Sequence, residues 1–373
     1  MNPLQRLTTL GQSISLDLLG RNLISSGDLK RLIADDAVTA VTSNPAIFES
    51  SILKSDLYDA DLQTLARGGK SVQDIYTALT IKDVQDAADL LRPTYDRTNG
   101  ADGFVSLEVS PHSALDTDAT ITEARQLWKL LDRPNVYVKI PGTEPGLEAI
   151  RLATAEGINI NVTLLFSLDR YRAVIEAYLA GLEAHLAAGH KIAHIASVAS
   201  FFLSRIDSVT DPLLEKIISE GGEKAATAQA LYGEVAIASA RQAYVIWQEV
   251  FSSERFKKLA AQGAQKQRLL WASTGTKNKA FSDVKYVEAL IGPETVNTMP
   301  LETLEAYRDH GQPAARLLDG LADAQGQLNQ LAALGVNLTK ITADLEAEGI
   351  EKFVVPFKKL FAALEEKRAA VGQ

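Results

Sequence analysis

Lys139 lies inside a run of strand-forming residues, Val136–Ile140, which Pro141 and Gly142 bring to an end. An ammonium group in a buried strand must be paired, hydrated in a cleft or neutralised, because leaving it buried and charged costs a large free energy. A neutral lysine amine can attack a ketone and form a Schiff base. The competing interpretation is a structural lysine whose head reaches water outside the fold. Lys139 is therefore a candidate covalent catalyst.

Polar side chains occur at or near the ends of the other predicted strands, and their types suit the same chemistry. Schiff-base formation needs proton transfers at the carbinolamine, which a relay of Glu108, water and Thr163 could supply. Cleavage of a carbon–carbon bond then needs a base for a substrate hydroxyl, and Asp17 suits that role. No metal is needed. The other members of this set are Thr42, Asn44, Ser106, Asn161, Ser200, Arg205, Ser273 and Lys277.

Several of these residues also have ordinary structural interpretations. Asp17 could cap a following helix, and Asn44 before a proline is typical of a turn or helix start. Glu108 could form a buried salt bridge with the strand lysine. Arg205 and Lys277, taken singly, would more often be surface charges. The catalytic interpretation therefore depends on whether one scaffold brings all of these residues together.

Alternation of strands and helices along the chain predicts that scaffold. Short β-branched or apolar runs are separated by amphipathic helical patterns, which favours a parallel sheet with helical crossovers. Eight such units predict an α/β fold with a single (β/α)8 barrel over residues 1–373, whose active site lies at the carboxyl ends of the strands. The predicted strands are Ser13–Leu16, Val38–Thr42, Gly103–Val109, Val136–Ile140, Ile160–Phe166, His194–Ser200, Arg268–Ser273 and Val296–Met299. The helical patterns include Ser71–Leu91, Ile121–Leu131, Gly146–Ala155, Leu168–Ala187 and Glu223–Phe251.

Two long helical regions exceed the minimal unit, an insertion at about residues 207–265 and a C-terminal region at about 301–373. The tail, Glu348–Gln373, is predicted to be an amphipathic helix that starts or kinks at Pro356. We interpret its apolar stripe as core packing, with a subunit contact or a lid over the barrel mouth as alternatives. The stripe consists of Phe353, Val354, Phe357, Leu360, Phe361 and Leu364.

Composition narrows the functional class. The 373 residues are 46% hydrophobic, which is ample for a large core, and carry a net charge of −9. Such acidity is unfavourable for binding nucleic acid or anionic membranes. The chain has no cysteine, which excludes disulfides and thiolate chemistry. Residues 1–17 do not read as a signal peptide, and no apolar run approaches the ~20 residues of a membrane span. We expect a cytoplasmic protein, monomeric or homodimeric, and interpret the His190–His194 pair as structural because it lies at the bottom of the barrel.

Four motifs resemble the transaldolase family, in the order in which that family carries them. They are Leu16-Asp17, Thr42-Ser43-Asn44-Pro45, Val138-Lys139-Ile140-Pro141-Gly142-Thr143 and Asn161-Val162-Thr163-Leu164-Leu165-Phe166-Ser167. The resemblance covers roughly residues 10–340. The chain length and the run Trp271–Asn278 resemble the longer bacterial and plant-type branch.

The resemblance implies a class I aldolase barrel without a cofactor. The implied reaction is reversible transfer of a dihydroxyacetone unit from sedoheptulose 7-phosphate or fructose 6-phosphate to glyceraldehyde 3-phosphate or erythrose 4-phosphate, in the non-oxidative pentose phosphate pathway. A related fructose 6-phosphate aldolase, a non-catalytic barrel and a metal-dependent aldolase are the rival functions. The aldolase would use the same lysine. A non-catalytic barrel would be expected to lack the catalytic residues, and a metal-dependent aldolase would need a histidine cluster on the active face, which this sequence does not predict.

The resemblance also implies roles for individual residues. Lys139 matches the Schiff-base lysine, Asp17 the acid/base, and Glu108 with Thr163 the pair that positions a catalytic water. Asn44 and Asn161 match donors to the dihydroxyacetone hydroxyls, with Thr42 and Ser106 nearby. Ser200, Phe202 and Arg205 match the sixth-strand segment, where Arg205 would grip the phosphate. The seventh strand departs from the family pattern, because Lys277 follows where a second arginine is usual and the spacing differs, so Ser273 is the safer predicted phosphate ligand.

Overall fold

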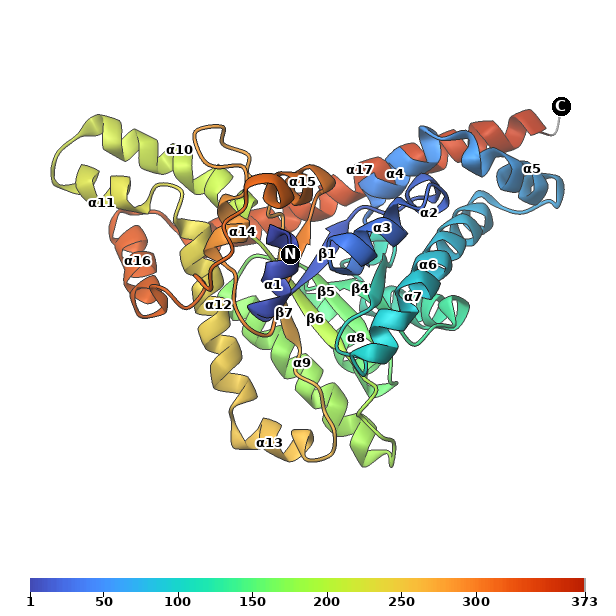
Figure 1. The fold of residues 1–373 in the computed structure, drawn as a ribbon, viewed down its shortest axis with the longest axis horizontal. Coiled ribbons are helices and arrows are strands. Elements are labelled where there is room, and N and C mark those ends of the chain that lie inside the picture. The colour runs from blue at the N-terminus through green and yellow to red at the C-terminus, as the bar shows by residue number, and fades with distance from the viewer. Residues whose placement is uncertain (372–373) are drawn as a thin grey trace.

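The computed structural model describes residues 1–371, and within them eight parallel strands close into a barrel in sequence order (Figure 1). All eight predicted strands are confirmed, with ends that move by at most three residues. The largest shift is at β6, which begins at Ser197 and not at His194. The strands are β1 Gln12–Asp17, β2 Val38–Thr42, β3 Phe104–Glu108, β4 Val136–Pro141, β5 Ile160–Leu165, β6 Ser197–Phe202, β7 Arg268–Ala272 and β8 Thr295–Met299. The predicted (β/α)8 barrel is therefore confirmed, while the single-domain boundary at 1–373 stays a prediction.

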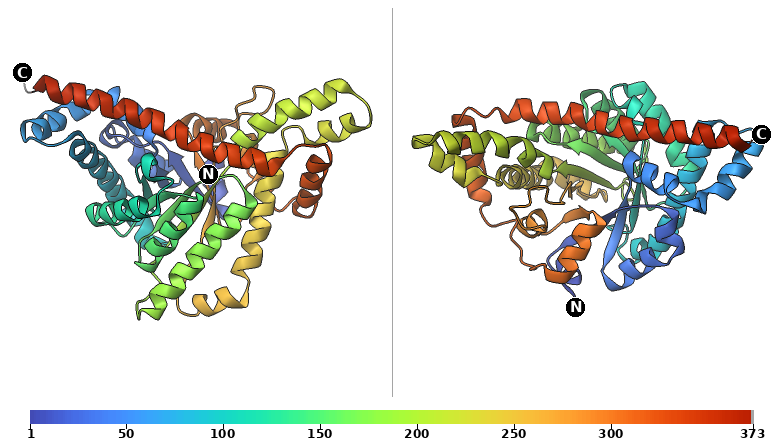
Figure 2. Two further views of the ribbon diagram at one scale, coloured as in Figure 1. Left: turned by 180° about the vertical axis from the view of Figure 1, so that it is seen from behind. Right: turned by 90° about the horizontal axis from the view of Figure 1, so that it is seen from above.

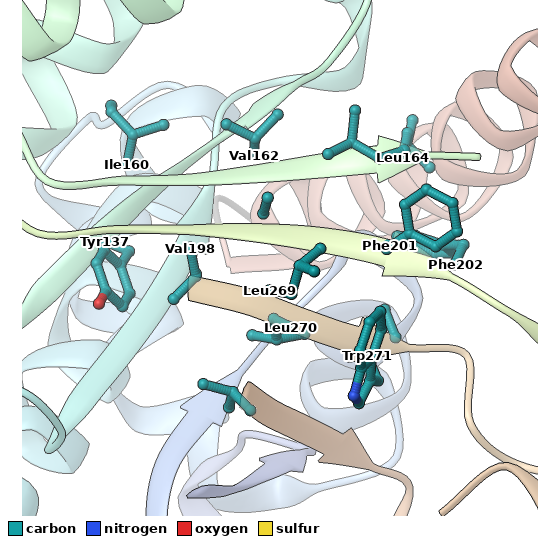
Figure 3. Packing of buried hydrophobic residues seen from close by; sticks show 14 of the residues in the cluster. Tyr137, Ile160, Val162, Leu164, Val198, Phe201, Phe202, Leu269, Leu270 and Trp271 are labelled. Carbon is teal, nitrogen blue, oxygen red and sulfur yellow. The ribbon is translucent and has the colours of Figure 1, made fainter. Parts of the chain in front are cut away.

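The barrel strands are buried on both faces, and the two faces carry different side chains. Successive residues of a strand point to opposite faces, so Ile160 and Val162 lie on one side of β5 and pack towards the helices (Figure 3). Asn161 and Thr163 therefore point into the barrel. The same alternation places polar groups inside at the upper end of the barrel and apolar groups outside, where burial of the latter drives folding.

Helices surround the barrel and connect its strands. Before β4 they are α1 Pro3–Thr9, α2 Arg21–Ser25, α3 Asp28–Asp35, α4 Pro45–Leu53, η1 Asp56–Tyr58, α5 Asp59–Arg67, α6 Val72–Arg97, η2 Pro111–Ser113 and α7 Thr117–Leu131. After β4 they are α8 Glu144–Ala155, α9 Leu168–Ala187, α10 Ser204–Glu220, α11 Glu223–Leu231, α12 Val235–Phe251, α13 Glu254–Ala260, α14 Lys285–Ala289, α15 Leu301–His310, α16 Leu321–Ala333 and α17 Leu338–Val371.

The insertion between β6 and β7 contains α10 to α13, and one prediction there is wrong. The pattern Glu223–Phe251 forms two helices and not one, because the chain turns at Gly233, whose φ of 73° is left-handed. A side chain at this position would also meet Phe281 at 2.4 Å. Periodicity continued across the break because both helices bury an apolar face.

The C-terminal helix α17 runs the length of the molecule as one continuous helix (Figure 2). It begins at Leu338, so the prediction that it starts at Pro356 is wrong; Pro356 lies in its interior. Residues 372 and 373 of the predicted tail lie outside the described residues. The helix packs against α4, α5, α6 and α10 and touches β5. Its apolar stripe is buried except for the partly exposed Phe361, which confirms the interpretation as core packing.

The amino-terminal end of the barrel is held by polar contacts. Arg268 reaches from β7 to Asp102 at 3.0 Å and to the hydroxyl of Ser13 at 2.6 Å. His190 and His194 lie in the segment before β6, so His194 precedes the strand that it was predicted to open. Among residues 1–371 no cluster of three or more metal-ligating side chains is found, and no helix in that range has the length and apolar character to cross a membrane.

Candidate active site

A cavity of about 200 Å³ opens at the carboxyl ends of the strands. Ten of the thirteen predicted site residues line it, while Glu108, Ser106 and Asn161 lie just beyond its wall. Five further residues complete the lining. The full set is Asp17, Thr42, Asn44, Lys139, Thr163, Ser200, Phe202, Arg205, Ala272, Ser273, Gly275, Lys277, Thr298, Pro300 and Phe353.

Lys139 lies at the centre of this group and is only 5% exposed. Its Nζ donates a hydrogen bond to the carbonyl oxygen of Ser43 at 2.8 Å and lies 3.6 Å from Oε2 of Glu108. Strand register explains the arrangement, because Lys139 on β4 is paired with Glu108 on β3 and with Asn161 on β5. The alternative of a lysine reaching water outside the fold is therefore wrong.

Glu108 is a buried carboxyl whose environment disfavours its charge. Burial raises its pKa to about 7, with Lys139 opposing that shift and the charge of Asp17 adding to it. At 3.6 Å the contact with Lys139 is an ion pair and too long for a good hydrogen bond. Neither carboxylate oxygen of Glu108 has a hydrogen-bond partner among the described residues, and the same holds for Oγ1 of Thr163. The structural alternative, a Glu108–Lys139 salt bridge, is therefore present. It leaves both carboxylate oxygens of Glu108 without a hydrogen bond from any described residue.

Asp17 stands at the end of β1 with one oxygen held and the other facing the cavity. Thr42 Oγ1 donates to its Oδ1 at 2.7 Å. Burial raises the pKa of Asp17, while Lys139, the Thr42 hydrogen bond and Arg205 act against that rise. The helix-cap interpretation of Asp17 is wrong, because the next helix, α2, is preceded by Gly20 and has no side-chain cap.

The amide of Asn161 joins two hydroxyls beside the lysine. Its Nδ2 donates to Ser106 Oγ at 3.1 Å, and its Oδ1 accepts from Ser200 Oγ at 2.7 Å.

Asn44 has both a structural and a site role. It caps α4 by accepting from the backbone N–H of Ile47 at 3.1 Å, and it also lines the cavity.

The far end of the cavity is cationic. Arg205 is mostly buried over the ring of Phe202, with its guanidinium carbon 5.4 Å from the ring centroid. Its Nη1 is buried without a hydrogen-bond partner among the described residues. Burial lowers the pKa of Arg205, and the charges of Glu348 and Asp17 oppose this. Ser273 shares a 2.9 Å hydrogen bond with Ser204, and Lys277 lies exposed at the rim.

Sequence reasoning missed several lining residues, of which Thr298 and Phe353 matter most. Thr298 had a usable signal, since it is a polar residue near the end of the predicted eighth strand. Phe353 was predicted only as a member of the tail's apolar stripe, for which a lid over the barrel mouth was one alternative; the packing of α17 brings it to the cavity. The helix α17 therefore packs its apolar stripe in the core and, at Phe353, also covers the barrel mouth, as the lid alternative predicts.

Comparison with known proteins agrees with this geometry. A family model described as Transaldolase/Fructose-6-phosphate aldolase matches residues 14–364. The chain belongs to this family. It is 45% identical to a transaldolase of Trichodesmium erythraeum over 98% of this chain and 97% of that one. It is 47% identical to a transaldolase of Thermobifida fusca over 99% of both chains. It is 48% identical to a transaldolase of Saccharopolyspora erythraea over 98% of this chain and 97% of that one.

Proposed function

We propose that this protein is a transaldolase, a transferase that moves a dihydroxyacetone unit between phosphorylated sugars through a Schiff base on Lys139. The observation that carries the proposal is a buried lysine amine in one small cavity with a carboxylate, hydroxyls and a guanidinium whose buried Nη1 has no hydrogen-bond partner in the described part of the chain. Family membership and identities of 45–48% over nearly the whole chain support it. The proposed donors are sedoheptulose 7-phosphate and fructose 6-phosphate, and the acceptors are glyceraldehyde 3-phosphate and erythrose 4-phosphate, as in the non-oxidative pentose phosphate pathway.

The first half-reaction forms and uses the Schiff base. The amine of Lys139 attacks the ketone carbon, and the carbinolamine loses water to give an iminium. Asp17 takes the proton of the substrate hydroxyl on the second carbon beyond the ketone carbon. The adjacent carbon–carbon bond then breaks, its electrons pass into the iminium to give an enamine, and an aldehyde leaves. The second half-reaction reverses these steps with a new aldehyde, to which Asp17 returns the proton.

Proton transfers at the carbinolamine are assigned to Glu108 and Thr163 acting on one water. Both present buried oxygens that have no hydrogen-bond partner within residues 1–371, and Glu108 lies 3.6 Å from the lysine nitrogen. A carboxyl whose pKa is about 7 can both accept and release a proton near neutral pH. Asn44, Asn161, Ser106 and Thr42 are proposed to orient the dihydroxyacetone hydroxyls.

Phosphate binding is assigned to the cationic end of the cavity. Among residues 1–371 the buried Nη1 of Arg205 has no hydrogen-bond partner, and a phosphate oxygen would satisfy it with a charge-assisted hydrogen bond. Ser273 contributes a hydroxyl to the lining of the same cavity, and the exposed Lys277 adds a point charge. Ser200 and Phe202 also line this cavity.

Borohydride trapping tests the proposal directly. Protein incubated with fructose 6-phosphate and reduced should carry a three-carbon adduct, located on Lys139 by peptide mass spectrometry. Lys139→Arg keeps the positive charge and should give no adduct. Lys277→Met, which removes the other lysine that lines the cavity, should still give it. An adduct absent from folded wild-type protein, or found on another lysine, would refute the proposal.

The rival activity within the family is fructose 6-phosphate cleavage without transfer, since the matching family model names both. A transferase stalls after one aldehyde per site when no acceptor is present, whereas an aldolase continues to turn over. Release of glyceraldehyde 3-phosphate with and without erythrose 4-phosphate separates the two. A cytoplasmic location and a monomeric or homodimeric state stay predictions.

A further inference from the structure

A chain of three buried hydroxyls leads from Asp17 into the interior of the barrel. Thr42 Oγ1 is 2.7 Å from Asp17 Oδ1 and 2.7 Å from Thr298 Oγ1, and Thr298 Oγ1 is 3.3 Å from Ser15 Oγ. None of the three hydroxyl residues is more than 5% exposed. Strand register builds the chain, because Asp17 is paired with Thr42 across β1 and β2, and Ser15 with Thr298 across β1 and β8.

Proton counting gives the chain two arrangements. Each hydroxyl has a single proton to donate, and an ionised carboxylate only accepts. When Asp17 is ionised, Thr42 donates to Asp17 and Thr298 must therefore donate to Thr42. When Asp17 is protonated and turns its proton towards Thr42, the direction reverses: Thr42 donates to Thr298, and Thr298 donates to Ser15. The Thr298–Ser15 contact has hydrogen-bond geometry only with Thr298 as the donor, so Ser15 takes part only in the second arrangement, as an acceptor.

We propose that Thr298 and Ser15 are positioning residues whose hydroxyl chain holds the proton on Asp17 between the two halves of the transfer reaction. This inference rests on the proposed function. The proton comes from the donor sugar's hydroxyl when the carbon–carbon bond breaks. It stays on the Asp17 carboxyl until the acceptor reaches the enamine, and it goes to the acceptor's aldehyde oxygen when the new bond forms. A transferase needs such storage, because the proton is returned to a different molecule.

Ser15 allows a clean test, because it is fully buried, does not line the cavity and reaches Asp17 only through Thr298. Ser15→Ala removes an acceptor used only by protonated Asp17, so it should make Asp17 easier to ionise. The limb of the kcat–pH profile that reports Asp17 should move to lower pH by roughly 0.4–1 pH unit, the equivalent of one neutral hydrogen bond. KM should stay unchanged, since Ser15 touches no substrate.

Other charges also act on Asp17 and must stay constant in the comparison. Lys139 and Arg205 favour its ionised form, Glu302 on α15 disfavours it, and Glu108 is close enough to interact with it electrostatically. None of them contacts Ser15. The matched control is Ser13→Ala, which removes another buried hydroxyl from the same strand and face; Ser13 bonds Asp102 and Arg268 and should leave the limb in place.

Thr298 variants test the order of the chain. Thr298→Val keeps the shape and removes the hydroxyl, whereas Thr298→Ser keeps the hydroxyl and should retain the wild-type limb. Because Ser15 acts only through Thr298, adding Ser15→Ala to Thr298→Val should cause no further shift. If Thr298→Val does not fold, Ser15→Ala against Ser13→Ala still decides the question.

Infrared titration of the Asp17 carboxyl, taken as the difference between each protein and its Asp17→Asn partner, gives the same readout without substrate. Because this titration needs no substrate, it tests the hydroxyl chain separately from the proposed function. Wild-type protein that does not turn over sugar phosphates would refute the proposed function, whatever the titration of Asp17 shows. An unchanged Asp17 titration in Ser15→Ala would overturn the hydroxyl chain. So would a Ser15→Ala shift that persists in the Thr298→Val background.

Discussion

Replacement of Arg205 by methionine should weaken substrate binding greatly while leaving the fold as stable or more stable. In the free enzyme its buried Nη1 has no hydrogen-bond partner among the residues that the structure describes, which costs about 1–3 kcal/mol. The contact with the Phe202 ring offsets about 0.5–1 kcal/mol of that cost. Methionine keeps the apolar stem against Phe202 and removes the guanidinium. The free energy of unfolding should therefore rise by roughly 0–2 kcal/mol.

The same guanidinium should be worth much more once a phosphate is bound. A hydrogen bond to a charged group is worth about 1.5–3 kcal/mol, so loss of a bidentate contact, about 3–6 kcal/mol, should lower kcat/KM by roughly 10²–10⁴-fold. The loss should appear with fructose 6-phosphate and be nearly absent with unphosphorylated fructose. Steady-state kinetics on both sugars and urea unfolding measure the two effects.

Arg241→Met is the matched control for this variant. Arg241 on α12 also has a buried nitrogen, Nε, that no described residue hydrogen-bonds, and burial likewise lowers its pKa, but Arg241 does not line the cavity. Its replacement should leave the kinetics on both sugars unchanged. An equal loss on phosphorylated and unphosphorylated sugar by Arg205→Met, or a loss of more than about 1 kcal/mol in unfolding free energy, would show that Arg205 is structural.

Two further predictions concern stability. Glu108 has a folded-state pKa of about 7 against 4.5 for the free side chain, so its contribution is full below pH 4.5 and falls as the pH rises to about 7, by on the order of 3 kcal/mol. Glu108→Gln should remove this fall from the free energy of unfolding, measured with urea between pH 5 and 8. Parallel plots of unfolding free energy against pH for wild type and variant would contradict the assignment. Gly103→Ala should destabilise by more than about 3 kcal/mol, because φ is 91° and the new Cβ would lie 2.3 Å from the Tyr95 nitrogen, whereas Gly69→Ala, with φ of 75° and open space, should cost about 1–2 kcal/mol in the same assay. Equal losses in the two glycine variants would show that the close backbone contact is not what constrains Gly103.

Local patterns were sufficient for much of the fold. Parallel barrel strands are buried on both faces and appear as short continuous apolar runs, which is why all eight were recognised. Their ends were least accurate at β6, where the segment before the strand is also apolar. The break at Gly233 and the start of α17 at Leu338 were missed, because helical periodicity does not register a left-handed residue or a proline tolerated within a long helix.

The candidate site divides in the same way. Strand-end residues such as Lys139 and Asp17 could be found from the sequence, because a strand's carboxyl end in a barrel always faces the common cavity. Thr298 could have been found by the same argument. Phe353 was anticipated only through the lid alternative for the tail, since the place of its helix over the barrel depends on contacts with distant elements.

The order of strands and helices, the residues at the strand ends and the chemistry that they suit follow from the amino-acid sequence, since alternation and residue type are local properties. Distances and side-chain environments depend on the folded chain. Closure of the barrel places β8 beside β1 and so joins Ser15, Thr298 and Thr42 into one chain. Burial brings the pKa of Glu108 to about 7, and it leaves one nitrogen of Arg205 without a protein partner. These properties arise because groups far apart in the chain pack together and exclude water from the site. No local sequence pattern specifies that packing.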